Sequence, residues 1–235
     1  MLLCFGSFIM MPIGGGPMCE LDHRDGRAFV SRGGIKLENA LAATGLVVAG
    51  RHALDVGAST GGFTDCMLRR GATGVIAVDV GYGQLDWGLR NDPRVSVLER
   101  TNARALTPEL LPYMPDLVTI DVSFISLAKI LPAVLGCLAE PYDVLALVKP
   151  QFEVGRALAS KGRGVIRDPA DRRAALVGVG EAALGLGASV LGYHSSGLAG
   201  PKGNKETFVW LAEPGRAGGA PNTGEIEKMA REVEP

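Results

Sequence analysis

The sequence predicts an α/β fold in which parallel strands alternate with helices. Residues 55–63 form a glycine-rich turn that joins an apolar strand pattern to the start of a helix. The next strand pattern along the chain ends in Asp79, and two later ones end in Asp121 and Lys149. Ligands of open parallel sheets bind at the carboxyl ends of the strands, so these charged ends predict a binding site at one edge of the sheet.

The rest of the chain supplies the alternating elements that this fold requires. A first helix follows Ser31 and ends at Thr44 and Gly45, where a glycine breaks the apolar spacing. Strands are expected at seven short apolar segments, residues 52–54, 74–78, 95–98, 117–120, 144–148, 188–193 and 207–211. Further helices are expected from residue 63, around residues 87–89, in the apolar stretch up to residue 138, and at residues 169–186.

The composition indicates one large α/β domain with an apolar core. The chain has 235 residues, of which 47% are hydrophobic and 21% are charged, and this is enough to bury a full core. Its net charge of −1 gives no overall attraction for nucleic acid, so any affinity for RNA must come from a local patch or from a partner. We expect a poorly specified lead-in at residues 1–27, the folded domain at 28–212 and a disordered tail at 213–235.

The cysteines and the apolar runs predict a cytoplasmic protein. Four cysteines, at positions 4, 19, 66 and 137, lack the C-x-x-C spacing of metal sites and read as reduced thiols. The N-terminal segment has no basic region ahead of its apolar residues, as a signal peptide would have, and no apolar run reaches the length of a membrane span. We therefore expect no metal site and no membrane partner.

The turn at residues 55–63 carries the pattern that points to a cofactor. Its spacing is D-x-G-x-x-x-G-G, which differs from the G-x-G-x-x-G of dinucleotide sites and lacks the Gly-Lys-Ser/Thr of a P-loop. Gly57 and Gly61 let the backbone approach a ligand, and the helix that follows directs free N–H groups at the turn. An acid before the first glycine suits a cofactor with a charged amino-acid end, such as S-adenosylmethionine. The alternative is a turn whose glycines serve packing alone.

Polar residues outside the turn suggest further contacts. Asp79, after the second strand, is placed to accept hydrogen bonds from two ribose hydroxyls of a nucleoside cofactor. Asn102 follows the third strand, where its amide either reads an adenine edge or stabilises a turn. Lys36, between apolar neighbours of the first helix, reads as a surface lysine. The basic segment 154–168 either contacts phosphate groups or is solvated, and its cations are Arg156, Lys161, Arg163 and Arg167.

Six blocks of the sequence, in order along the chain, resemble one known family. They are residues 30–37, 54–63, 78–85, 120–127, 148–153 and 200–204, and they include SRGGIKL, DVGASTGGF, DVSFISL, KPQFE and GPKGN. The region 28–212 is similar to the TlyA/hemolysin-A family of S-adenosylmethionine-dependent ribosomal RNA 2′-O-methyltransferases, which have an FtsJ-like (RrmJ) domain. This resemblance implies a Rossmann-like methyltransferase sheet of seven strands, six parallel and one antiparallel, with helices on both faces.

The resemblance also implies the site residues. The FtsJ-like site uses a Lys-Asp-Lys-Glu tetrad, and by block its members fall on Lys36, Asp121, Lys149 and Glu206. This assignment replaces the reading of Lys36 as a surface lysine. Cofactor contacts fall on Asp55, Gly57, Ala58, Ser59, Thr60, Gly61, Gly62, Phe63, Asp79 and Asn102, with Asp121 near the methyl group. Lys149 is then the candidate either to accept the proton of a ribose hydroxyl or to orient that hydroxyl.

The implied substrate is ribosomal RNA or a ribosomal subunit. The family usually carries an S4-like RNA-binding domain ahead of the methyltransferase, but only residues 1–27 precede the match here. We expect that this chain lacks the domain; the alternative is a truncated or mis-assigned start. Two other classes are alternatives: a small-molecule O-methyltransferase, whose metal-dependent members need a carboxylate cluster that the sequence lacks, and a non-catalytic S-adenosylmethionine-binding or hemolysin-like protein. The tetrad and the basic segment favour the RNA enzyme.

Overall fold

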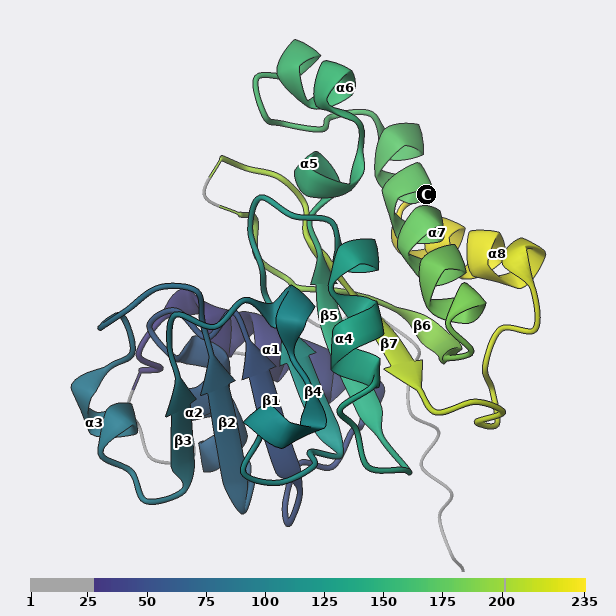
Figure 1. The fold of residues 1–235 in the computed structure, drawn as a ribbon. Coiled ribbons are helices and arrows are strands. Elements are labelled where there is room, and N and C mark those ends of the chain that lie inside the picture. The colour runs from purple at the N-terminus through teal and green to yellow at the C-terminus, as the bar shows by residue number, and fades with distance from the viewer. Residues whose placement is uncertain (1–27, 201) are drawn as a thin grey trace, which may run out of the picture.

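A seven-stranded sheet forms the centre of the computed structural model, which describes residues 28–200 and 202–235 (Figure 1). The expected lead-in at residues 1–27 lies outside the described residues. The strands are β1 (His52–Val56), β2 (Gly74–Val78), β3 (Val95–Leu98), β4 (Leu117–Ile120), β5 (Asp143–Val148), β6 (Ser189–Ser195) and β7 (Thr207–Ala212). They lie in the order β3-β2-β1-β4-β5-β7-β6, and β7 runs antiparallel to both of its neighbours. The predicted Rossmann-like sheet with one antiparallel strand is confirmed.

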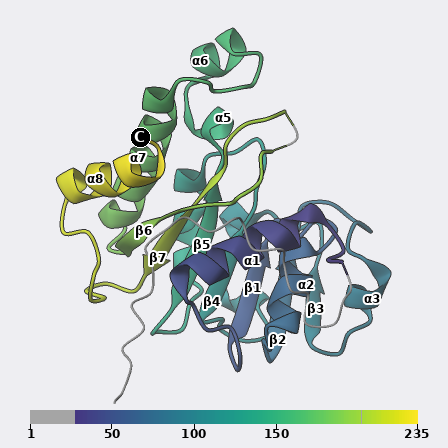
Figure 2. The same cartoon turned by 180° about the vertical axis from the view of Figure 1, so that it is seen from behind.

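Helices cover both faces of this sheet (Figures 1 and 2). On one face lie α1 (Arg32–Thr44), α2 (Gly62–Arg69) and α3 (Trp87–Arg90); on the other lie α4 (Leu131–Leu135), α7 (Pro169–Gly185) and α8 (Thr223–Val233). Successive residues of β1 point to opposite faces of the sheet: Ala53 belongs to the core cluster that includes residues of α1 and α2, whereas Leu54 and Val56 belong to the cluster that includes residues of α4 and α7. None of the described helices is long and apolar enough to cross a lipid bilayer.

Short helical turns fill several connections, and two of them differ from expectation. They are η1 (Ala103–Ala105), η2 (Pro108–Leu110), η3 (Leu127–Lys129), α5 (Pro150–Glu153) and α6 (Arg156–Lys161). The helix expected up to residue 138 is divided into η3 and α4, because Pro132 lacks an N–H group and is suited to begin a helix rather than continue one. The basic segment 154–168 is not a loop throughout, since α6 forms within it.

The prediction of a disordered tail at residues 213–235 is wrong. Residues 223–233 form α8, which packs against α7 and β6. Ile226 and Ala230, four residues apart, are fully buried, and Met229 and Val233 pack against the same core. The polar composition of this segment concealed an amphipathic helix, because few apolar residues suffice when they share one face.

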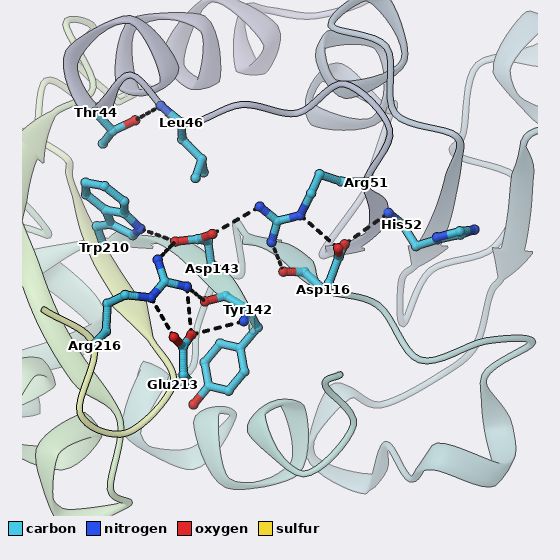
Figure 3. A network of polar contacts seen from close by, with 10 residues as sticks. All are labelled: Thr44, Leu46, Arg51, His52, Asp116, Tyr142, Asp143, Trp210, Glu213 and Arg216. Carbon is cyan, nitrogen blue, oxygen red and sulfur yellow. Dashed lines mark hydrogen bonds and ion pairs between the residues drawn. The ribbon is translucent and has the colours of Figure 1, made fainter. Parts of the chain in front are cut away.

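A polar network holds together the strand ends that lie opposite the predicted site (Figure 3). Asp143, at the start of β5, accepts hydrogen bonds from Arg51 Nη1 at 3.1 Å, Trp210 Nε1 at 2.9 Å and Arg216 Nη1 at 3.3 Å. Arg51 also pairs with Asp116, ahead of β4, at 2.9 Å. The network therefore ties the segments that precede β1, β4 and β5 to the end of β7. It lies at the amino ends of the parallel strands, whereas the predicted site lies at their carboxyl ends.

Candidate active site

Two glycines of the 55–63 turn adopt left-handed backbone conformations that other residues rarely take. Their φ angles are +85° at Gly57 and +95° at Gly61. Gly57 N donates to the carbonyl of Val78 at 2.8 Å, and a Cβ on Gly57 would lie 2.5 Å from the carbonyl oxygen of Asp121. The turn therefore passes across the ends of β2 and β4 at a distance that only glycine allows. Gly61 precedes α2 as its N-cap, so the first N–H groups of α2 lie beside the turn.

Asp55 supports the turn from inside the sheet. Its carboxylate is fully buried and accepts hydrogen bonds from Thr64 Oγ1 at 2.7 Å and Thr119 Oγ1 at 3.2 Å. Burial outweighs these two bonds and raises the pKa of Asp55 to about 7. A cation bound nearby favours the ionised carboxylate, so a positively charged ligand suits this position.

The turn and the strand ends border a cavity of about 260 Å³, here called the first cavity. Eight of the residues predicted for the cofactor border it: Asp55, Gly57, Ala58, Ser59, Thr60, Gly62, Phe63 and Asp121. The start of α1 borders it too, through Ser31, Arg32 and Gly33, which the sequence reasoning did not assign to the cofactor. Ser31 caps α1 by accepting from Gly33 N at 3.2 Å, and this polar cap was the available signal for a helix start reaching the site.

Three of the predicted cofactor residues do not border the first cavity. Gly61 packs against α3. Asp79 accepts hydrogen bonds from two backbone N–H groups, one of them Ser59 N at 2.8 Å, and thereby fixes the turn to the end of β2. Its oxygens retain lone pairs for a ligand, because each can accept more than one bond. Asn102 is exposed and caps η1 by accepting from the backbone N–H two residues later at 3.1 Å, which is the turn-stabilising alternative.

The four tetrad residues form two ion pairs at the carboxyl ends of the strands. Lys36 Nζ lies 2.5 Å from Glu206 Oε2 and joins α1 to the segment entering β7. Lys149 Nζ lies 2.5 Å from Asp121 Oδ1 and donates to Ser123 Oγ at 3.1 Å, which joins the ends of β5 and β4. Both lysines are 9% exposed and Glu206 is 2% exposed. Lysine is rarely this buried without a partner, so the pairs hold both ammonium groups in place.

A second cavity, of about 680 Å³, adjoins the first at the tetrad. Lys36, Asp121, Ser123 and Lys149 border both cavities, and Glu206 borders the second. The rest of the second cavity is bordered by Phe124, Gln151, Phe152, Ala159, Ser160, Arg163, Gly164, Gly200, Lys202 and Asn204. The two ammonium groups therefore lie at the boundary between two binding spaces, and the second is within the size range of small-molecule sites.

An aromatic pair and two cations mark the entrance of the second cavity. Phe124 is 90% exposed, has a left-handed φ of +66°, and its ring centroid lies 5.1 Å from that of Phe152. Strained backbone conformations are frequent at functional sites, and this makes Phe124 a candidate for ligand contact. Arg163 and Lys202 supply positive charge at the same entrance. Phe124 was not predicted as a site residue, because it stands among apolar residues in the sequence and nothing there indicates that its side chain is exposed.

The basic segment 154–168 contributes one described cation to this site. Arg163 borders the second cavity, whereas Arg167 is exposed and borders neither cavity. The side chains of Arg156 and Lys161 lie outside the described part of the structure. Among the described side chains of this segment, Arg163 is therefore the candidate for a phosphate contact at the cavity.

The fold and the site together define a class of protein. A seven-stranded sheet with one antiparallel strand, a glycine-rich turn after β1 and an acid after β2 are typical of the Rossmann-like methyltransferases that use S-adenosylmethionine. The model of the FtsJ-like methyltransferase family matches residues 29–213, and the chain belongs to this family.

The names of similar proteins agree with this assignment. The chain is 56% identical over 185 residues to the "16S/23S rRNA (cytidine-2'-O)-methyltransferase TlyA" of Mycobacterium tuberculosis. The aligned region covers 79% of this chain and 69% of the relative. It is 42% identical over 179 residues to "Hemolysin A" of Brachyspira hyodysenteriae, covering 76% of this chain and 74% of that protein. The resemblance to the TlyA/hemolysin-A family is confirmed.

Solved structures give the same picture. A putative hemolysin from Streptococcus thermophilus superposes with a TM-score of 0.81 at 42% identity, covering 88% of this chain and 75% of that one. A putative S-adenosylmethionine-dependent methyltransferase from Listeria monocytogenes superposes with a TM-score of 0.56 at 14% identity, covering 78% of this chain and 99% of that one. The second similarity shows the fold alone.

Proposed function

We propose that the chain binds S-adenosylmethionine in the first cavity and methylates a ribose 2′-hydroxyl of ribosomal RNA that enters through the second. The observation that carries this proposal is that Lys36, Asp121 and Lys149 border both cavities. A transferase must bring donor and acceptor together in line, so reactive groups belong at the boundary between two binding spaces. The activity of the relative named as a cytidine-2'-O rRNA methyltransferase supports RNA as the acceptor. A cytoplasmic location, where ribosomes are found, goes with this substrate.

The residues around the first cavity fit the cofactor. Asp55 and Asp121 supply negative charge for the cofactor's ammonium and sulfonium groups, and Arg32 supplies positive charge for its carboxylate. The backbone approach at Gly57 leaves the cavity open to a ligand's polar end. Asp79, at the end of β2, is the candidate acceptor for the ribose hydroxyls.

Lys149 is the residue that we assign to the chemical step. When bound, the cofactor supplies an electrophilic methyl group on a sulfonium sulfur. Lys149 has three N–H donors, of which two face Asp121 and Ser123, and this leaves one to hold the ribose hydroxyl at the boundary. An ammonium held there orients the oxygen and stabilises the charge that develops as the hydroxyl proton passes to the Asp121 carboxylate, which borders both cavities, or to solvent. The paired Lys36 and Glu206 fix the opposite side of the same boundary.

The entrance of the second cavity suits a single-stranded or unpaired nucleotide. Aromatic faces stack on unpaired bases without selecting a sequence, and Phe124 and Phe152 present such faces together. Arg163 and Lys202 are placed to contact backbone phosphates, which position an RNA rather than identify it. We assign RNA docking to these residues and the methyl transfer to the tetrad.

The decisive experiment is transfer of tritiated methyl groups from S-adenosylmethionine to isolated 30S and 50S ribosomal subunits, followed by mapping of the modified nucleotide. The proposal expects label in a ribose of ribosomal RNA, lost in Lys149→Ala and kept in Lys129→Ala, a change of an exposed lysine outside both cavities. Label in a base, in ribosomal protein or only in added small alcohols and phenols would contradict it. The last of these results would favour a small-molecule methyltransferase.

A further inference from the structure

One wall of the second cavity has an unusual backbone conformation. This wall, here called the 159–167 segment, borders the cavity through Ala159, Ser160, Arg163 and Gly164. Arg163 and Gly164 are successive left-handed residues, with φ of +51° and +82°. Glycine tolerates this conformation, but arginine does so only where the surrounding structure holds it. Hydrogen bonds at the end of α6, from Arg163 N to the carbonyl of Ser160 at 3.0 Å and from Gly164 N to that of Ala159 at 2.8 Å, hold part of this backbone, and contacts from other elements hold the rest.

Asn204, which also borders the second cavity, binds this segment directly. It is 3% exposed, its Oδ1 accepts from Ile166 N at 2.9 Å, and its Nδ2 donates to the carbonyl of Gly164 at 2.7 Å. One amide side chain thus satisfies a donor and an acceptor two residues apart, which fixes the local backbone. Asn204 stands two residues before Glu206, the partner of Lys36, so a single short stretch of chain joins the wall to the tetrad.

A buried ion pair holds the other end of the segment. Arg172, 6% exposed, donates from Nη1 to the carbonyl oxygens of Arg167 at 2.6 Å and Ile166 at 3.3 Å. Its Nη2 donates to Glu234 Oε2 at 2.7 Å, and Glu234 is 3% exposed. Glu234 follows α8, and Lys205 Nζ lies 3.6 Å from the same carboxylate oxygen. The end of the chain, the start of α7 and the 159–167 segment are therefore tied by one arginine.

We propose that Asn204, Arg172 and Glu234 form a clamp that positions substrate RNA by holding the 159–167 segment at a fixed place relative to the tetrad. None of the three enters the chemical step; they act through the backbone that carries Arg163. The proposal deepens the proposed function and rests on it, because it assumes that RNA occupies the second cavity. It assigns a role to α8, which packs against α7 and β6 and contributes no residue to either cavity.

Two conservative variants test the clamp. Asn204→Asp keeps the acceptor for Ile166 N and replaces the donor to Gly164 with a repelling oxygen; Glu234→Gln keeps the shape and removes the charge facing Arg172. The matched control is Glu227→Gln, which removes an exposed carboxylate of α8 that lies 3.4 Å from Arg231. Each variant is assayed for methylation of ribosomal subunits across subunit concentrations, for S-adenosylmethionine affinity by calorimetry, and for amide hydrogen exchange at residues 162–167.

The clamp predicts a KM for ribosomal subunits about five- to tenfold higher in both variants, with kcat changed by less than about threefold. It also predicts faster exchange at residues 162–167 and an unchanged affinity for S-adenosylmethionine. The control keeps the parent values. A parent-like KM in the two variants, or a loss of cofactor affinity equal to the change in KM, would overturn the clamp, because the first shows no effect on RNA and the second shows general loss of structure.

The failure of the proposed function looks different. A parent chain that transfers no label to ribosomal subunits overturns the substrate assignment, and the positioning of RNA falls with it. In that case exchange at residues 162–167 is still faster in the two variants than in the control. The contacts of the clamp are thereby tested separately from RNA methylation. Label transfer by the parent, with slow exchange at residues 162–167 in all three variants, overturns the clamp alone.

Discussion

Lys149 Nζ lies 2.5 Å from Asp121 Oδ1, and these two side chains, which end neighbouring strands, border both cavities of the site. Neither residue could occupy this position if its strand were one residue longer or shorter, because alternate residues point to opposite faces. The register of β4 and β5 therefore determines that both side chains lie at the boundary between the two cavities.

Lys149→Ala tests the role of this pair in the chemical step. Removing the ammonium leaves the hydroxyl unoriented and the developing charge unstabilised, so the single-turnover rate at saturating RNA should fall by about 10²–10³. S-adenosylmethionine affinity should stay within about threefold, because the turn at residues 55–63 is intact. A normal saturating rate reached only at higher RNA concentration would show that Lys149 is a phosphate contact instead.

The Lys36–Glu206 pair allows stability and activity to be separated. Glu206→Gln leaves Lys36 buried without its counter-charge and should lower the free energy of unfolding by about 3–5 kcal/mol. Adding Lys36→Met to it removes the stranded charge and should recover most of this loss, measured by urea unfolding, while methyl transfer stays low. Recovery of activity together with stability would reduce the pair to a structural role.

Asp79→Ala tests the cofactor assignment at the end of β2. The change removes an acceptor for ribose hydroxyls and also releases Ser59 N, so affinity for S-adenosylmethionine should fall by about 1.5–3 kcal/mol. Calorimetry measures it directly, and Asp86→Ala is the matched control because Asp86 is an exposed carboxylate that caps α3. Equal affinity in the Asp79 variant and the parent would remove Asp79 from the site.

The sequence predicted the strands, the glycine turn and the charged strand ends because each depends on local pattern. Apolar runs closed by glycine or by a charged residue give strand boundaries, and Asp121 and Lys149 lie where those boundaries predict. Asn102, by contrast, has the turn role that its position allowed equally. The sequence pattern alone does not distinguish contact with an adenine edge from stabilisation of a turn, because both roles are compatible with an Asn just after a strand.

Long-range pairings were beyond local pattern. Lys36 and Glu206 are 170 residues apart, and only the family resemblance brought them together. The helix α8 was missed because the polar composition of residues 213–235 outweighed the helical spacing of its few apolar residues, and the elements that these residues pack against, α7 and β6, lie far away in the sequence. The same holds for Arg172 and Glu234, whose burial depends on where that helix packs.

Asp55 makes folding stability depend on pH in a way that a single variant isolates. In the folded chain its pKa is raised by burial from 3.8 to about 7, so the folded state holds this proton where the unfolded state has lost it. Stability from this group is therefore full at low pH and is lost as pH rises from about 4 to about 7, by up to about 4 kcal/mol. Asp55→Asn should abolish this decline, and the comparison of unfolding curves at pH 5 and pH 8 measures it. Equal pH dependence in parent and variant would place the Asp55 proton outside the folding equilibrium.

Arg163→Ala tests whether the entrance of the second cavity contacts RNA phosphates. Arg163 is exposed, borders the cavity and is held by a left-handed backbone, whereas Arg231 is an exposed arginine on α8 that borders neither cavity and serves as the matched control. Each phosphate contact releases about one counterion, so the variant should raise the KM for RNA and lower the slope of log KM against log salt by about 0.7–0.9. The saturating rate should not change, because Arg163 does not contact the tetrad pairs. If Arg231→Ala flattens the salt dependence as much as Arg163→Ala does, the effect comes from overall charge and the phosphate contact is excluded.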